Sequence, residues 1–578
     1  MPPPSPSGAE NPSTERKPVN FADLDPALRP LLDRYLAPDD RSRIEPVIAE
    51  LGELAAGELD GLAAAAEVNV PTLRQFSPSG DRIDEVDFHT SYEEMVEIGF
   101  CRFGLAALSH RGVLGWSAAA PHVVKYALSY LFSQAEYGLG CPINMTDSAA
   151  RVLEMFDPEA FRAEIEALTS TDAEAHATGA MFMTEIDGGT DLAQTATVAT
   201  DHGDHWTLKG RKWFCSNVTA DVILTLAQVP GQGEGTRGLG MFLLPRLRPD
   251  GSRNSYRIDR LKNKLGTRSM ASGEVTLDDA HARPIGDLTR GVQQMLEMVN
   301  HSRVSNVMRS TALMRRAVHE AITHTRQRVV FGKPLFDQPL MRRTLLGLQL
   351  DTEAALGIVL EIGDQLEKGD AGDERARLVA RVLTPMSKYT VCKRGRWVTS
   401  EAMEVRGGNG YIEDWINPRL VRDAQLGSIW EGASNVVALD VLRCMRLHSA
   451  HQILADSYLE RLRSGELAGE MPLVGRLDDH WRALRDRGDA LLASDRDEQE
   501  LAVGDFTEAL SQAAMATLLV EQASWEVKEG LGSRKTLVAQ AFLQRMFTPE
   551  EVPTAAVAAL EVIVDGGAPD RAREVSAW

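Results

Sequence analysis

The spacing of apolar residues changes twice along this chain, and these changes divide it into regions. From residue 21 to about residue 177, apolar residues recur three and four positions apart, which predicts amphipathic helices broken at prolines. Between about residues 179 and 284 they fall in short alternating runs separated by Gly, Asp and Pro, which predicts a small antiparallel barrel or sandwich. From residue 290 to about residue 447 long helical patterns return, and four of them predict a helix bundle.

Two further segments flank these regions. The first 20 residues are rich in Pro, Ser and charge without periodicity, so we expect a disordered tail. After His448 the helical pattern continues to the end, with a linker expected at Gly465, Gly469 and Pro472. The predicted segments are a tail (1–20), an N-terminal helical domain (21–177), a β-barrel domain (178–285), a four-helix bundle (286–447) and an acidic helical C-terminal extension (448–578).

Charge and cysteine usage narrow the function classes. The formal net charge is −21, and the segment after residue 447 holds 13 basic and 23 acidic residues, which argues against nucleic acid as a partner unless local basic patches override the average. The five cysteines lie far apart without a Cys-x-x-Cys pair, so we predict neither disulfides nor a metal site. Because no long apolar run occurs, we expect no membrane segment and a cytoplasmic location.

Four unusual segments carry candidate chemistry: residues 183–191, 211–217, 407–411 and 429–435. In the last of these, Glu431 lies between Trp430 and a glycine just before an apolar helix. Burial beside an aromatic ring raises the pKa of a carboxyl group and suits it to act as a general base. A lone Glu at this position is equally compatible with a favourable charge at a helix terminus. The order of all four segments suggests a flavin site.

The motif set resembles the acyl-CoA dehydrogenase family, and more closely its AidB-like branch. The segments that carry this resemblance are residues 141–146, 184–191, 261–269, 392–395, 401–405, 407–411 and 428–432. The resemblance implies a mainly α fold with an inserted β-barrel domain, followed here by a C-terminal helical extension. It also implies a homotetramer with one FAD per subunit, whose ring system lies between the β domain and the bundle.

The resemblance also implies roles for individual residues. Glu431 is the expected catalytic base, and Arg328 is expected to contact the FAD pyrophosphate of a neighbouring subunit. A hydroxyl near Trp213 is expected to face the flavin; the family places it where this chain has Cys215, and Ser216 follows, so both stay candidates. Without the resemblance, a helix-terminating glycine cluster is the better interpretation of residues 407–411. The expected cofactor-binding residues are Met183, Thr184, Gly189, Thr190, Trp213, Cys215, Ser216, Arg328, Phe331, Gln338, Gly407, Gly408, Gly410, Trp430, Gly432 and Asn435.

We therefore expect an FAD-dependent oxidoreductase that dehydrogenates an acyl thioester, with the acyl group carried by CoA or a carrier protein. Electron-transfer flavoprotein or O₂ would accept the electrons. Two alternatives stay open: an AidB-like DNA-binding alkylation-response flavoprotein, which needs a basic DNA-facing surface, and a flavin monooxygenase on the same fold. The family usually has Pro where this chain has Ile186, which leaves the acyl group undefined.

Overall fold

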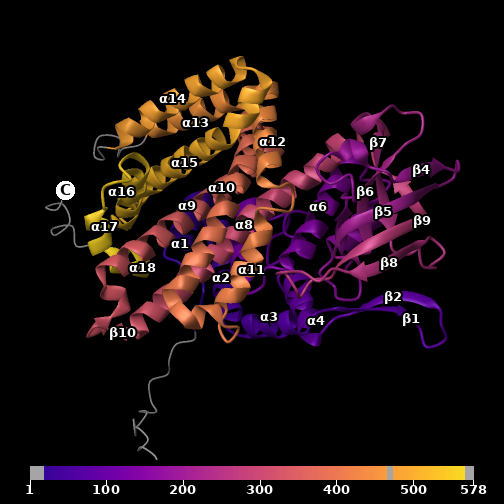
Figure 1. Ribbon diagram of the computed structural model, residues 1–578, viewed down its shortest axis with the longest axis horizontal. Coiled ribbons are helices and arrows are strands. Elements are labelled where there is room, and N and C mark those ends of the chain that lie inside the picture. The colour runs from indigo at the N-terminus through magenta and orange to yellow at the C-terminus, as the bar shows by residue number, and fades with distance from the viewer. Residues whose placement is uncertain (1–18, 465–472, 567–578) are drawn as a thin grey trace, which may run out of the picture.

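The chain folds into an N-terminal helical region, a β domain, a helix bundle and a helical C-terminal extension (Figure 1). This computed structural model describes residues 19–464 and 473–566. The first 18 residues of the predicted tail and the predicted linker at Gly465, Gly469 and Pro472 lie outside the described residues. In Figure 1 the β domain lies on the right, the extension at the upper left and the bundle between them. No helix in the described ranges has both the length and the apolar character needed to cross a bilayer.

The N-terminal region is helical as predicted, but it also contains a β-hairpin that the sequence did not reveal. The hairpin strands are short and largely exposed, so they lack a periodic apolar signal. The Gln75 amide donates to the main-chain oxygens of Ile258 and Asp259 at 3.1 and 3.0 Å, which attaches the hairpin to the β domain. The elements are α1 (Leu28–Tyr35), α2 (Pro38–Ala56), α3 (Glu58–Val68), β1 (Thr72–Phe76), β2 (Arg82–Asp87), α4 (Thr90–Val96), α5 (His122–Ala135), α6 (Gly140–Phe156) and α7 (Arg162–Leu168).

The β domain is a seven-stranded, barrel-like sheet that encloses its own apolar core. All seven strands lie within the region where the alternating runs predict a β domain, and β3 and β4 are the shortest of them. The expectation of a purely antiparallel sheet was wrong, because β3 and β4 both pair with β6 in parallel. The strands are β3 (Gly179–Phe182), β4 (Val198–Asp201), β5 (Trp206–Ser216), β6 (Val222–Gln228), β7 (Leu239–Pro245), β8 (Tyr256–Leu261) and β9 (Ser272–Pro284).

The bundle consists of the four predicted long helices and one shorter helix between the last two. The first of them has 37 residues and spans about 55 Å at 1.5 Å per residue. It begins beside the β domain, since Gly291 packs against the main chain of Leu239 and Gly240, and it ends far from that domain (Figure 1). The helices are α8 (Gly291–Gln327), α9 (Pro339–Asp370), α10 (Glu374–Arg406), α11 (Asn417–Gly427) and α12 (Ser434–His448).

The C-terminal extension packs on the bundle and shares its apolar core. Its longest helix lies against three bundle helices, α9, α10 and α12. Buried ion pairs join the two parts, among them Glu353 of the bundle with Arg534 and Lys535 of the extension. The helices are α13 (Ala450–Ser464), α14 (Val474–Ala493), α15 (Arg496–Lys528), α16 (Arg534–Phe547), α17 (Thr554–Ala558) and α18 (Leu560–Asp565).

Candidate active site

The expected base, Glu431, lies in the turn between α11 and α12, and its backbone is in an unfavourable conformation. Its φ is 55°, a region that side-chain-bearing residues seldom adopt, and the next residue, Gly432, has a φ of 100°. Two cations from other helices hold this turn: Arg303 Nε donates to the Glu431 carbonyl at 3.1 Å, and the Lys388 ammonium donates to the Gly432 carbonyl. Strain that is stabilised from both sides in this way is typical of functional sites.

The carboxyl group of Glu431 has the electrostatic setting of a general base. Burial raises its pKa above the ordinary value for Glu, and the hydroxyl of Ser302 and the cations Arg309, Lys388 and Arg303 oppose that rise. The main-chain N–H of Glu431 has no acceptor within the described part of the chain. A proton-accepting carboxyl thus lies beside a free hydrogen-bond donor, which is the pair needed to remove a proton next to a carbonyl.

Trp430 packs beside a buried arginine and a tyrosine. The ring of Trp430 stacks with that of Tyr137 at 5.9 Å between centroids. The guanidinium carbon of Arg309 lies 4.5 Å from the Trp430 ring centroid and 5.2 Å from that of Tyr137. Trp430 and Met183 border the same apolar cluster, which also contains Cys141. The structure therefore brings together residues from the N-terminal region, the β domain and the bundle.

A series of polar contacts connects the β domain to this cluster. Ser216 Oγ lies 3.5 Å from Ser272 Oγ, and Lys264 Nζ donates to Ser272 Oγ at 3.3 Å. Burial lowers the pKa of Lys264 to about 8, and Cys141 is the largest of the groups that oppose that shift. Burial raises the pKa of Cys141 to about 11, while Arg309 opposes and Glu431 adds to the rise. These contacts connect Ser216 through Ser272 to the buried Lys264.

The two candidates for a flavin-facing group differ in position. Cys215 is fully buried in the apolar core of the β domain, and burial raises the pKa of its thiol. Ser216 is half-buried and points toward Ser272. This arrangement favours Ser216 as the hydroxyl at the site and gives Cys215 a packing role.

The segment that follows β3 is attached to β5 by a main-chain hydrogen bond and a buried ion pair. Trp213 N donates to the Thr184 carbonyl at 2.8 Å, and the Lys262 ammonium lies 3.4 Å from the Trp213 ring centroid. Behind this contact, the buried Lys212 donates to Glu185 at 2.7 Å. Met183 and Thr184 are half-buried, whereas Gly189 and Thr190 are exposed in the turn that follows.

A second group of the expected cofactor-binding residues lies at the far end of α8. Arg328 is exposed with no side-chain partner among the described residues, and Phe331 is 99% exposed with a φ of 50°. Gln338 donates to the Val330 carbonyl at 3.1 Å. Figure 1 shows β10 (Val329–Val330) at the opposite end of the molecule from β5. One copy of the chain therefore does not bring these residues to Glu431.

The glycine cluster also lies at this end, since Arg406 pairs with Glu320 of α8 at 2.6 Å. Gly407 has a φ of 70°, and a side chain at Gly407 or Gly408 would meet no atom within 4 Å. Open space in front of bare backbone suits close approach of a dinucleotide. Gly410 is buried and has a packing reason to be glycine, because a Cβ there would lie 2.2 Å from the Met403 carbonyl. Asn435 is exposed in the first turn of α12.

The expected cofactor-binding residues form two groups, and each group suits a different part of FAD. The free guanidinium of Arg328 and the open glycines suit a diphosphate and its nucleoside. Met183 and Trp430, which border one apolar cluster, suit contact with an aromatic ring system. The two parts lie at opposite ends of α8, so one copy of the chain does not bring them together.

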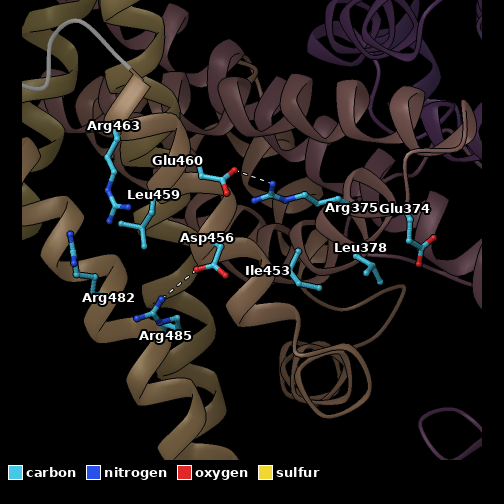
Figure 2. A pocket seen from close by; sticks show the side chains of 10 residues that line it. All are labelled: Glu374, Arg375, Leu378, Ile453, Asp456, Leu459, Glu460, Arg463, Arg482 and Arg485. Atoms are coloured by element: carbon cyan, nitrogen blue, oxygen red, sulfur yellow. Dashed lines mark hydrogen bonds and ion pairs between the residues drawn. The ribbon is translucent and has the colours of Figure 1, made fainter.

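An arginine-lined groove lies elsewhere, between α10, α13 and α14, and it has a volume of about 530 Å³ (Figure 2). Arg375 pairs with Glu460 at 2.9 Å and Arg485 with Asp456 at 3.4 Å. The other two arginines of the groove, Arg463 and Arg482, both pair with Asp478. Since each guanidinium has a carboxylate partner, the groove is not a free phosphate-binding surface.

The sequence did not single out several residues of the site. Arg303, Arg309 and Lys388 lie within helices whose apolar stripes suggested only core packing, and Cys141 and Lys264 belong to motifs without an assigned role. The available signal was the presence of charged residues within long apolar helical patterns, because buried charges require partners.

Family comparisons cover most of the chain before the C-terminal extension. Residues 11–175 match the adaptive response protein AidB N-terminal domain, residues 180–280 the acyl-CoA dehydrogenase middle domain and residues 289–446 the acyl-CoA dehydrogenase C-terminal domain. The matches confirm the expected family and its AidB-like branch.

Individual relatives agree with these matches. AidB of Escherichia coli strain K12 is 36% identical over 72% of this chain and 76% of its own length. Acyl-CoA dehydrogenase family member 11 of Caenorhabditis elegans is 34% identical over 72% and 69%. The structure of Caenorhabditis elegans ACDH-11 in complex with C11-CoA superimposes with a TM-score of 0.84 at 27% identity, covering 96% of this chain and 98% of that one. The apo form of Bd2924 gives 0.78 at 30% identity, with 87% and 98% covered.

Proposed function

Because the chain belongs to the acyl-CoA dehydrogenase family, we propose that it is an FAD-dependent oxidoreductase that forms a double bond between the α and β carbons of an acyl thioester. The observation that carries this proposal is the Glu431 carboxyl group, whose pKa is raised by burial and which lies beside an unpaired main-chain N–H. The C11-CoA complex of the similar ACDH-11 structure supports a CoA thioester as the substrate class.

Glu431 is the group that removes the α-proton. Its carboxylate accepts the proton at one oxygen, and its main-chain N–H donates to the thioester carbonyl as negative charge develops there. Arg303 and Lys388 hold the turn through its carbonyls, so carboxylate and N–H keep their relative positions. Bound FAD supplies the acceptor for the hydride that leaves the β-carbon. Ser216 would donate a hydrogen bond to the flavin.

The division of the expected cofactor-binding residues between the two ends of α8 supports an assembly of several copies. We propose that Arg328, Phe331 and the Gly407–Gly408 backbone contact the FAD of a neighbouring copy, within a homotetramer. The 99% exposure of the Phe331 ring supports this assembly, because an exposed aromatic beside a free Arg is typical of an interface. The electron acceptor would be an electron-transfer flavoprotein or O₂. The five free cysteines support a reducing compartment, and we propose the cytoplasm.

The test is anaerobic titration of the FAD-loaded protein with a panel of acyl-CoA thioesters, including straight, branched and ω-carboxylated chains. We expect loss of flavin absorbance with at least one of them and appearance of the corresponding enoyl product. Absence of bleaching across the panel, with FAD bound, would remove the proposal.

Two other functions have less support. A flavin monooxygenase on this fold has no need for a carboxyl base, and Glu431 argues against that function. DNA binding requires unpaired cations, whereas the arginines of the groove in Figure 2 are neutralised by Asp and Glu. A salt-dependent mobility shift on duplex DNA at physiological ionic strength would reverse this preference.

A further inference from the structure

Asp440 is a largely buried carboxylate that joins two arginines beside the Glu431 turn. It lies in the middle of α12, and its side chain is 12% exposed. Its Oδ1 accepts from Arg381 Nη2 at 2.7 Å, and its Oδ2 accepts from Arg381 Nη1 at 3.0 Å and from Arg303 Nη1. Because Arg381 contacts both oxygens, it fixes the plane of the carboxylate and the direction in which Arg303 is held.

Arg303 transmits this restraint to the proposed base. Its Nε donates to the Glu431 carbonyl at 3.1 Å, while its Nη1 donates to Asp440 and to Asn300 Oδ1 at 3.2 Å. The guanidinium is planar, so a partner at Nη1 also sets the direction of the Nε–H bond. The φ of 55° at Glu431 persists only where the surroundings enforce it. The position of Asp440 therefore helps to determine where the strained turn is held.

The charge of Asp440 also bears on the Glu431 carboxyl. Burial raises the pKa of Glu431, and the nearby cations Arg309, Lys388 and Arg303 oppose that rise. Although burial disfavours the charge of Asp440, its arginine partners hold the pKa of Asp440 below the usual value, so it offsets the charge of Arg303. Without that offset, Arg303 would favour the ionised Glu431 more strongly, and a carboxylate with a lower pKa is a weaker base.

Other titratable groups surround this network, on α6, α8, α10, α12 and the β domain. They are Cys141, Glu297, His301, Lys388, Cys444 and Lys264. Burial raises the pKa of both thiols to about 11 and lowers the pKa of the imidazole and of both ammonium groups. Since two lysines here have lowered pKa values, a pH profile alone would not identify Glu431, and a test must isolate its titration.

A second carboxylate in the same bundle forms a similar bridge without a base beside it. Asp60 of α3 pairs with Arg316 of α8 at 2.9 Å and with Arg419 of α11 at 3.1 Å. Arg316 and Arg303 are each 6% exposed, so the two bridges are similarly buried on the α8 side. The difference is that Arg303 also donates to the Glu431 carbonyl. Asp60 is therefore the matched control for a bridge that only stabilises the fold.

We propose that Asp440 is a positioning residue for the reaction: it holds Arg303 against the Glu431 carbonyl and neutralises that cation beside the base. This inference rests on the proposed function, because it takes Glu431 as the group that removes the α-proton. Asp440 acts through Arg303 and does not itself contact the reacting atoms.

The first measurement uses the full-length protein without a thioester. Urea unfolding is followed across pH for the wild type and Glu431→Gln, and the difference between their unfolding free energies reports the titration of Glu431. The pair is then repeated with Asp440→Asn and with Arg381→Gln. We expect Asp440→Asn to shift the Glu431 titration to lower pH by about 0.5–1 unit. Arg381→Gln should shift it to higher pH, because it removes a positive charge instead of a negative one.

The second measurement is the stopped-flow rate of flavin reduction at saturating thioester. Asp440→Asn should slow reduction by about 10- to 100-fold through misplacement of the base and move the acid limb of the pH profile to lower pH. Asp440→Glu keeps the charge, so it should keep the acid limb and recover part of the rate. Asp60→Asn should lower stability yet leave the rate within about threefold and the acid limb in place.

The remaining outcomes separate this inference from the dehydrogenase function. An unchanged Glu431 titration in Asp440→Asn, shifts of the same sign in Asp440→Asn and Arg381→Gln, or an equal loss of rate in Asp60→Asn overturns the role of Asp440. If Asp440→Asn does not fold, an unchanged Glu431 titration in Arg381→Gln overturns it. If no thioester reduces the flavin of the wild type, the dehydrogenase function fails, while opposite shifts in unfolding still support the coupling of Asp440 to Glu431.

Discussion

Two groups of buried charges in the same bundle differ in whether they are neutralised. Where α9 meets the C-terminal extension, Glu353 is fully buried between Arg534 and Lys535, and these cations hold its pKa well below the usual range. Around Glu431, burial raises the pKa, and Arg309 has no hydrogen-bonded counter-ion within the described ranges. The charges of the first group are paired with one another, whereas Arg309 in the second group has no hydrogen-bonded carboxylate among the described residues. The contact of Glu353 with Arg534 and Lys535, called the extension joint below, therefore stabilises the fold. The charges around Glu431 are instead arranged as in a ligand-binding site.

The largest expected effect separates catalysis from stability at Glu431. Glu431→Gln keeps the size of the side chain but removes the base, so the rate of flavin reduction should fall by about 10²- to 10⁴-fold. The rate of flavin reduction is measured by stopped flow, with a thioester that bleaches the flavin of the wild type. The control is Glu413→Gln, which removes a carboxylate from the exposed loop before α11. An equal loss of rate there would contradict the assignment.

The same residue predicts the direction of the pH dependence. The carboxyl must be ionised to accept a proton, so reduction should be lost as pH falls through a pKa that burial holds above the ordinary Glu value. A raised pKa also means that folding stability decreases as pH rises through that range. In Glu431→Gln the folding stability should not show this decrease with pH. Urea unfolding at several pH values measures it.

At the extension joint the expected effect is on stability. Glu353→Gln leaves Arg534 and Lys535 buried without their carboxylate and should cost about 3–5 kcal/mol in unfolding free energy. Because the pKa of Glu353 is lowered, its contribution is present above the ordinary pKa of Glu and is lost as pH falls through the lowered pKa. Urea unfolding at neutral and acid pH measures the loss of unfolding free energy and its dependence on pH.

An exposed ion pair between the bundle and the extension provides the control. Arg394 of α10 pairs with Glu508 of α15, and both side chains are 38% exposed. Glu508→Gln should change the unfolding free energy by about 0–1 kcal/mol. A loss as large as that of Glu353→Gln would show that burial does not explain the difference.

A smaller effect is expected at Gly407, at the end of the bundle away from the β domain. Gly407 has φ 70° and ψ −146°, a conformation nearly restricted to glycine, so Gly407→Ala should cost about 1–3 kcal/mol although the Cβ meets no atom. If the backbone there contacts FAD, the variant should also release FAD more readily, as measured by ultrafiltration. Gly372→Ala, at a positive φ with equally open space, is the control that should keep FAD.

The smallest expected effects distinguish Cys215 from Ser216. Cys215→Ala should lower stability by about 1 kcal/mol through a small cavity in the β core and leave flavin reduction unchanged. Ser216→Ala should slow flavin reduction by about tenfold, the effect of one lost hydrogen bond, with little change in stability. The reverse result would assign the flavin-facing role to Cys215.

Local pattern explains why most elements were predictable. The long helices and the principal strands are amphipathic or apolar over many residues, so period alone identifies them. The strands β1, β2 and β4 have few buried positions, and β3 has only four residues, so none of them carries a long periodic signal. Glu431 could be singled out as a candidate because its motif is local in sequence.

The sequence by itself determined the order of the regions, the family and the choice of Glu431 as the candidate base, because these depend on local spacing and motif. Only the tertiary structure decided which charges are neutralised, that Cys215 lies in the β core while Ser216 lies beside Ser272, and that Arg328 lies far from Glu431. Those properties depend on contacts between residues distant in the chain, where burial and the presence of a partner set the energy of each charge.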